Sequence, residues 1–284
     1  MPPRDNPTAR QVRLGGELRK LRERAGKTAR EAAGMVSTDQ AKISHIEAGR
    51  IGVSEDRIRR LAAFYACDDE ALVEALCTIA REHRGQHWWD DYRGVLAPGF
   101  LDIAELEHHC TALRCMQPVT FPGILQTESY AHALFASVIP QLPEDELKAR
   151  VEHRMKRQDI LERDAPPKFK ALVHEAALRM RVGGRKVLRG QLEHLLSVSE
   201  RPGLSLRVIP FTSEDFIDVT QTAMYASGVV PQLDTVHIDT PLGVLYLGAA
   251  ADLDRYRVLL DRAEQAALTP GESQNFIHHV TKEL

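Results

Sequence analysis

Apolar residues recur at helical spacing through roughly the first eighty residues of the chain. Leu14, Leu18 and Leu21 fall on one face of an expected helix whose other faces carry basic side chains. Thr28 should open the next helix, because Glu31 stands three positions later and the two residues form a capping box. Continued in this way, the pattern predicts four or five short helices in an all-α N-terminal domain.

A third short helix is expected directly after a tight turn at residues 37 and 38. Asp39 is a favourable N-cap, and Ile43 and Ile46 lie three positions apart, so both should point into a core. Gly49 occupies the place of the residue that ends such a helix. The outward face then consists of Gln40, Ala41, Ser44 and His45. Two short capped helices joined by a tight turn are typical of a helix-turn-helix unit.

The pattern changes after a charged junction near residues 81–86. Short segments with strand character are expected at 112–116, 169–173, 204–209, 223–226, 235–238 and 244–247. Helical spacing predicts helices over 101–111, 127–138, 143–164, 187–199, 252–267 and from Thr269, which forms a capping box with Glu272. The sequence therefore predicts a multi-domain chain. An all-α helix-turn-helix domain occupies 10–83, and an α+β domain around a small mixed sheet occupies 87–284.

The length and composition fit two soluble globular domains. The 284 residues are 43% hydrophobic and 27% charged, and no apolar run reaches the roughly 18 residues of a membrane-spanning helix. The N-terminus lacks the apolar segment of a signal peptide, so we expect a cytoplasmic protein that does not associate with a membrane. The four cysteines show no disulfide or metal-binding spacing and are expected to be reduced.

Charge is distributed unevenly along the chain. Residues 1–66 carry 14 Lys and Arg against 8 Asp and Glu, whereas the remainder carries 23 against 32. A basic module beside an acidic one is expected when only one domain contacts phosphate backbones, although such a split also arises by chance. The charge thus favours nucleic acid as a partner of the N-terminal domain.

The N-terminal region resembles the DNA-binding domains of Xre/Cro-type repressors. The resemblance covers about 55 residues and rests on two capped helices, the short turn and the run KISHIEAGR at 42–50. It departs from the family at Ser37, where glycine is usual and where serine at a positive φ would cost about 1 kcal/mol. The family places its third helix in the major groove and needs two copies on DNA, which implies a homodimer on a near-palindromic operator.

The resemblance assigns contacts with double-stranded DNA to side chains on and beside this third helix. Base contacts are expected from Gln40, Ala41, Ser44 and His45. Phosphate contacts are expected from Lys42, Arg50 and Arg57. A glutamine amide suits an adenine edge, and an alanine methyl group suits the methyl group of thymine. For each of these residues the alternative is an ordinary solvated side chain.

Motifs for catalysis or metal binding are incomplete. The run HEAAL at 174–178 begins like the HExxH motif of zinc proteases, but Leu178 stands where the second histidine ligand is required. The glycines before Arg185 suit a plain turn better than an anion site, and His108 and His109 would point about 100° apart on a helix. The run HWWDDY at 87–92 is better explained by apolar packing between the two domains than by binding of single-stranded nucleic acid. We therefore expect no enzyme activity, no cofactor and no metal.

Four runs in the longer region resemble the marks of a large actinomycete family that includes WhiJ-like developmental regulators. They are the tryptophan pair at 88–89, FPGILQTESYA at 121–131, HEAAL at 174–178 and PLGVLYL at 241–247. The family commonly has aspartate in place of His174. It joins an Xre-type domain to a C-terminal domain of poorly defined function and is often encoded beside a small partner protein.

This second resemblance implies a transcription regulator whose C-terminal domain dimerises and senses a small protein encoded nearby or a small-molecule effector. The alternative is an antitoxin-like module that sequesters the small protein and autoregulates its own operon.

Overall fold

The structure, a computed structural model, describes residues 4–82, 87–215, 221–240 and 243–284. It divides into two compact units, Met1–Arg93 with Val229–Leu233, and Gly94–Gly228 with Asp234–Leu284. Residues 83–86 of the predicted junction, and the first two residues of the PLGVLYL run, lie outside the described residues. Within the described residues, no helix combines the length and the apolar character that are needed to cross a bilayer.

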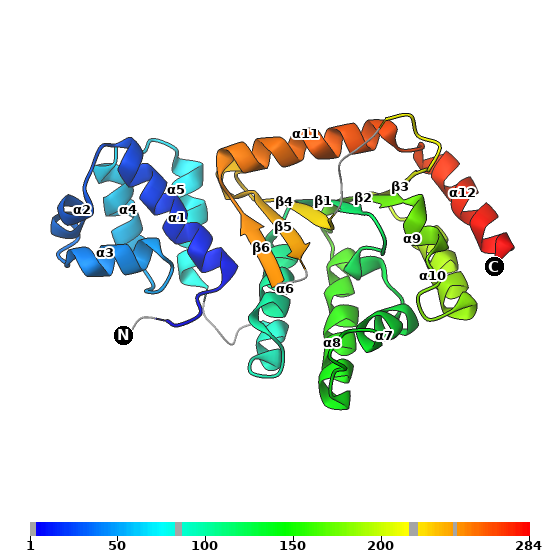
Figure 1. Ribbon diagram of the computed structural model, residues 1–284. Helices are drawn as coiled ribbons and strands as arrows, with labels where there is room; N and C mark the ends of the chain where they lie inside the picture. The colour runs from blue at the N-terminus through cyan, green and yellow to red at the C-terminus, as the bar shows by residue number, and fades with distance from the viewer. Residues whose placement is uncertain (1–3, 83–86, 216–220, 241–242) are drawn as a thin grey trace. The chain divides into compact units, whose positions relative to one another are not determined.

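The first unit is a bundle of short helices (Figure 1). Its described helices are α1 (Ala9–Arg24), α2 (Ala29–Met35), α3 (Gln40–Glu47), α4 (Glu55–Phe64), α5 (Glu70–Arg81) and the 3-10 helix η1 (Trp88–Tyr92). The capping box of Thr28 and Glu31 forms as predicted, and the carboxylates of Asp39 and Asp69 cap α3 and α5. The apolar faces of the helices meet in one core, which confirms the prediction of an all-α N-terminal domain.

A short segment from far along the chain also belongs to this unit. Val230 is buried among the apolar side chains of the helices. The backbone carbonyl of Gln232 accepts a hydrogen bond from Arg13, and the Gln232 side-chain amide donates to Asp69 at 2.7 Å. Periodicity in the sequence does not reveal such a contact, because periodicity reports only neighbours along the chain.

The second unit is built on a sheet whose described strands follow the order β3-β2-β1-β4-β5-β6. The strands are β1 (Ala112–Gln117), β2 (Lys168–His174), β3 (Leu204–Ile209), β4 (Ala223–Ser227), β5 (Thr235–Thr240) and β6 (Gly243–Leu247). β2 pairs parallel with both β1 and β3, whereas β4 pairs antiparallel with β1 and β5, and β6 pairs antiparallel with β5. Every predicted strand forms, so the prediction of an α+β domain around a mixed sheet is confirmed.

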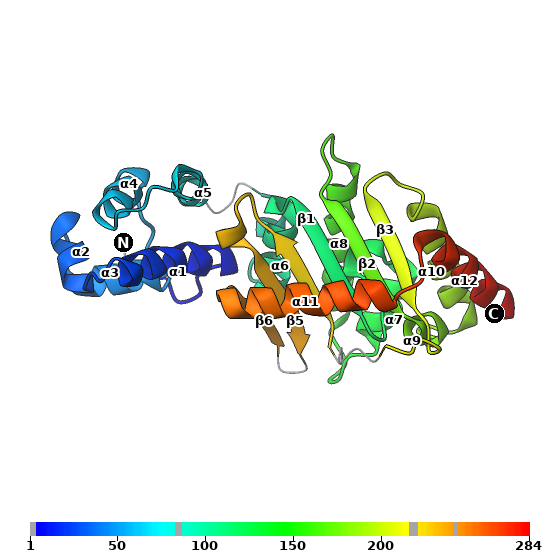
Figure 2. The ribbon, with the colours of Figure 1, turned by 90° about the horizontal axis from the view of Figure 1, so that it is seen from above.

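Helices cover both faces of this sheet. Along one face lies α11 (Ala250–Ala266), which crosses the strands in Figure 2. The other face is covered by α6 (Pro98–His109), α7 (Glu128–Ala136), α8 (Glu144–Lys156) and α10 (Arg185–Val198). α9 (Glu175–Arg179) follows β2 directly, and α12 (Pro270–Glu283) packs against α10 and β3.

Side chains alternate between these two layers along each strand. On β1, Leu113 and Cys115 join the core that contains residues of α7 and α10, while Met116 joins the core beneath α11. On β2, Phe169 and Leu172 divide between the two cores in the same way. The alternation that predicted the strands therefore also assigns their side chains to layers.

The helix expected at 143–164 is shorter than predicted. α8 ends at Lys156, and a 3-10 helix, η3 (Arg157–Glu162), continues the chain. A helical pattern in the sequence does not distinguish these two conformations, because residues three positions apart lie on one face in both.

Candidate functional site

The turn between α2 and α3 sets the direction of α3. Ser37 adopts a φ of 51°, in the left-handed region that glycine usually occupies. The Asp39 carboxylate accepts a hydrogen bond from the Lys42 backbone N–H at 2.7 Å and so caps the first turn of α3. Serine is thus accommodated at the position where the sequence departs from the repressor pattern.

α3 packs closely against α1 and the core. Ile43 and Ile46 are 1% and 2% exposed, as their spacing predicts. A Cβ atom on Gly15 of α1 would lie 2.4 Å from the carbonyl oxygen of Ile46, so glycine permits this approach of the two backbones. Arg22 on α1 also makes a bidentate ion pair with Glu47, with N–O distances of 2.6 and 2.9 Å. These contacts hold α3 against α1 and fix the orientation of its buried face.

The predicted contact residues lie on accessible parts of this unit. Four of them are exposed: Gln40, Ala41, Ser44 and Arg50. The other three are half-buried: Lys42, His45 and Arg57. Positions 41, 44 and 45 point away from the two buried isoleucines, and Gln40, in the first turn of α3, lies at the edge of this face. The Ser44 hydroxyl donates to the Gln40 carbonyl at 3.1 Å. The fold therefore gathers the four expected base-contact residues on one accessible helix face.

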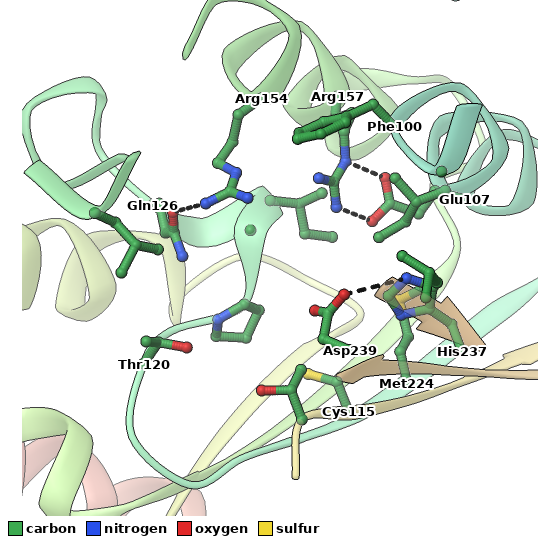
Figure 3. Close-up of a pocket in the computed structure, with 18 of the residues that line it drawn as sticks. Phe100, Glu107, Cys115, Thr120, Gln126, Arg154, Arg157, Met224, His237 and Asp239 are labelled. Carbon is green, nitrogen blue, oxygen red and sulfur yellow. Dashed lines mark hydrogen bonds and ion pairs between the residues drawn. The ribbon is translucent and has the colours of Figure 1, made fainter. Parts of the chain in front are cut away.

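The second unit contains a cavity of about 710 Å³ (Figure 3). Its walls come from α6, α7, α8, η3, several strands and the segment that carries the first part of the FPGILQTESYA run. The apolar part of the wall includes Phe100, Ile103, Phe121, Phe135, Phe169 and Met224. Three arginines, at positions 150, 154 and 157, also line the cavity and are held in different ways.

Arg157 forms a buried ion pair with Glu107 of α6. Hydrogen bonds of 2.7 and 2.6 Å join the guanidinium to the two carboxylate oxygens, and the residues are only 5% and 2% exposed. Burial alone would lower the pKa of Arg157, but the charge and hydrogen bonds of Glu107 raise it. Gly123 lies against this pair, because a Cβ at that position would be 3.1 Å from an Nη atom of Arg157.

Arg154 instead bonds to a neutral partner. Its Nη1 donates to Oε1 of Gln126 at 2.8 Å, and its guanidinium lies 4.1 Å from the centre of the Phe135 ring. Gln126 is itself fixed, since its Nε2 donates to the Phe121 carbonyl at 2.7 Å. Burial and the neighbouring Arg157 lower the pKa of Arg154 to about 9, so the side chain is still a cation at neutral pH.

The strand side of the cavity carries polar groups as well. The buried imidazole of His237 lies 3.6 Å from the Asp239 carboxylate, and burial lowers the pKa of His237. Gln117 accepts hydrogen bonds from the hydroxyls of Thr120 and Thr222, each at 3.1 Å. Polar groups therefore interrupt the apolar wall at several defined points, as is usual for sites that orient a small molecule.

The sequence candidates for metal binding have other partners. His174 accepts a hydrogen bond from the Ala176 N–H at 3.2 Å and caps α9. Glu175 accepts from the Phe211 N–H at 2.8 Å and from Arg179 at 2.6 Å. In the part of the chain that the structure describes, no three His, Cys, Asp or Glu side chains form a group suited to a metal ion.

The sequence pattern does not predict this cavity. Arg150, Arg154 and Arg157 stand four and three positions apart, and this spacing on one helical face is the available signal. In a heavily charged segment, however, the same spacing fits a solvated face. The opposing Glu107 and His237 come from distant segments, and only the fold brings them to the same cavity.

Two known families match the chain. Residues 13–76, which span most of α1 to α5, match a helix-turn-helix domain. Residues 100–279, more than half of the chain, match a domain of unknown function, DUF5753. No curated protein and no solved structure gives a significant match. The first unit is thus a helix-turn-helix domain of the kind found in DNA-binding regulators, and the chain belongs to the DUF5753 family.

Proposed function

We propose that this protein is a transcription regulator that reads a specific DNA sequence with α3. The observation that carries the proposal is the accessible polar face of α3, opposite the isoleucines that anchor the helix in the core. An α-helix fits the major groove of B-DNA, where each base pair presents its own pattern of donors and acceptors. Amide, hydroxyl and imidazole groups can complement such patterns.

Each predicted contact residue has a distinct role in this proposal. Gln40 bonds an adenine edge, the Ala41 methyl group contacts thymine, and Ser44 and His45 bond neighbouring bases. The basic residues bind phosphates and so position the helix without specifying the sequence; they are Lys42, Arg50 and Arg57.

Selection from random DNA duplexes with the purified full chain tests the DNA function. We expect one enriched motif, and Gln40→Ala should relax the preference at one position of it. Gln141→Ala removes an exposed glutamine of the second unit and serves as the matched control, which should select the wild-type motif. Recovery of random sequence by the wild-type protein would refute the proposal.

We also propose that the protein binds a near-palindromic operator as a homodimer, in the manner of Xre/Cro-type repressors. One such helix reads only a short half-site, so two copies about 34 Å apart are needed for useful affinity. Binding to duplexes that carry one or two half-sites measures this requirement. A monomer on DNA that binds one half-site as tightly as two would contradict the homodimer.

The DUF5753 domain dimerises and receives a signal in this proposal, either from a small protein encoded nearby or from a small molecule. Its support is the acidic balance of the chain after residue 66 and the cavity in the second unit. Such a signal acts on DNA binding only if it binds the DNA-competent and incompetent states with different affinities. Unchanged operator affinity at saturating partner would refute this step.

An antitoxin-like role is the second candidate, and the family marks of the longer region favour it. Deleting this gene while the neighbouring gene is intact separates the two roles. Lethality supports sequestration of a toxic partner, whereas viability with altered transcription supports the regulator. We propose no catalytic activity for the chain; the capping role of His174 and the ion pair of Glu175 argue only against a zinc-protease role for the HEAAL run.

A further inference from the structure

The cavity of the second unit presents one cation whose charge is poorly compensated. Arg150 is bonded to Glu146 at 2.6 Å, and Arg157 is bonded to Glu107. Arg154 has a neutral amide as its hydrogen-bond partner and makes no ion pair with any described residue. Asp239 acts on Arg154 through space, but no hydrogen bond joins the two in the described part of the chain.

Two polar atoms on the cavity wall also lack hydrogen bonds. The Nε of Arg154 and the hydroxyl oxygen of Tyr246 are buried and find no partner among the described residues. A buried donor without a partner costs about 1 to 3 kcal/mol, and a buried charge without a counter-ion costs more. A ligand with an acceptor and a negative charge would remove both costs.

The rest of the wall is suited to an apolar body. Phe100, Phe121 and Phe135 line the cavity, with Ile103, Leu134 and Val138 beside them. The cavity volume of about 710 Å³ falls within the range of roughly 300 to 1,000 Å³ that small-molecule sites occupy. Gln126 and Phe135 hold the Arg154 guanidinium in place before any ligand arrives, which lowers the cost of binding.

We propose that this cavity binds an organic anion, with its acidic group on Arg154 and its apolar body against the phenylalanine-rich wall. The Tyr246 hydroxyl, the other unpartnered polar group on the wall, donates a hydrogen bond to a polar atom of the same ligand. The inference rests on the proposed function only in naming the class of effector that the DUF5753 domain would sense. Occupation of the cavity itself does not depend on DNA binding.

A pair of fluorescent probes tests the proposal on the full chain. 8-Anilinonaphthalene-1-sulfonate is an organic anion, and N-phenyl-1-naphthylamine has the same apolar body without the sulfonate. We expect saturable binding of the sulfonate to the wild-type protein. Arg154→Gln should weaken it by at least about 10-fold and change the affinity of the neutral probe by less than about twofold. Arg189→Gln, which removes an exposed arginine of α10, should change neither.

Two further variants guard against misfolding and against binding elsewhere. Val138→Trp should fill part of the cavity and weaken both probes, and Arg154→Lys should retain more sulfonate affinity than Arg154→Gln because it keeps the charge. Circular dichroism checks that each variant is folded. If Arg154→Gln does not fold, the affinities of Val138→Trp and Arg154→Lys for the two probes test the proposal instead. Absence of saturable sulfonate binding, an equal effect of Arg154→Gln on both probes, or no effect of Val138→Trp would overturn the proposal.

The sulfonate probe also shows whether binding in the cavity affects DNA binding. If the sulfonate binds as expected but leaves operator affinity unchanged, the anion site stands and its role in sensing is refuted. If the protein binds no specific DNA but the probe pattern is found, the proposed function fails and the site remains.

Discussion

Replacing Glu107 by glutamine should destabilise the second unit by about 3 to 5 kcal/mol. The carboxylate binds Arg157 through two hydrogen bonds, and both residues are almost fully buried. Glutamine has a similar shape but no charge, so the variant leaves the Arg157 cation without its bonded counter-ion. For a unit of this size the loss corresponds to a fall in melting temperature of about 6 to 20 °C.

The assay is thermal and urea unfolding of the full chain. Trp88 and Trp89 both belong to the first unit, so tryptophan fluorescence follows that unit while far-UV circular dichroism follows both. The transition of the second unit should move in the Glu107→Gln variant. Glu162 pairs with Arg201 on the surface of the same unit, and Glu162→Gln should cost less than about 1 kcal/mol.

A double variant tests the electrostatic reason. Glu107→Leu with Arg157→Met removes both charges and keeps similar volume, so it should recover most of the stability lost in either single variant. A loss below about 1 kcal/mol in Glu107→Gln, or a double variant as unstable as the sum of the singles, would refute the reasoning.

The remaining predictions concern three other positions. Gln40→Ala should cost about 1 to 3 kcal/mol of binding free energy at one operator position; fluorescence anisotropy against single-base-pair variants measures this, and uniform weakening would reassign Gln40 to backbone contact. Gly15→Val should lower the free energy of unfolding by about 1 to 3 kcal/mol, because its Cβ would meet the Ile46 and Glu47 carbonyl oxygens at 2.4 and 2.5 Å; an unchanged urea midpoint would be inconsistent with that packing. Burial lowers the pKa of His153 from 6.5 to about 3. The contribution of the neutral imidazole to the free energy of unfolding is therefore fully present above pH 6.5 and is lost as the pH falls towards 3. His153→Phe should flatten the dependence of melting temperature on pH in that window, and the wild-type slope in the variant would contradict the assignment.

The helices of the first unit could be predicted because their signals are local. The capping pair Thr28 and Glu31 and the N-cap Asp39 lie within one turn of the helix that each begins. Ile43 and Ile46 are buried at the spacing that the helix requires. The segment around Val230 carries no such local signal, because its partners in the core lie far away in sequence.

In the second unit the sequence predicted the strands but not the cavity. Alternation along a strand reports which side chains share a face, yet it does not report which helix will cover them. Arg154 and Gln126 meet only because α8 packs beside the 3-10 helix at Gly123–Leu125, which Gln126 follows directly. The same separation hides the pairing of Arg157 with Glu107, which joins η3 to α6.

The most direct test of the account is the affinity of the full chain for its selected DNA sequence relative to a scrambled duplex. Fluorescence anisotropy at about 150 mM salt measures both affinities under conditions in which non-specific phosphate binding is weak. We predict a preference of at least about 10³-fold for the selected sequence, largely lost when Gln40 and Ser44 are both replaced by alanine. Equal affinity for the two duplexes would contradict the claim that α3 reads a DNA sequence.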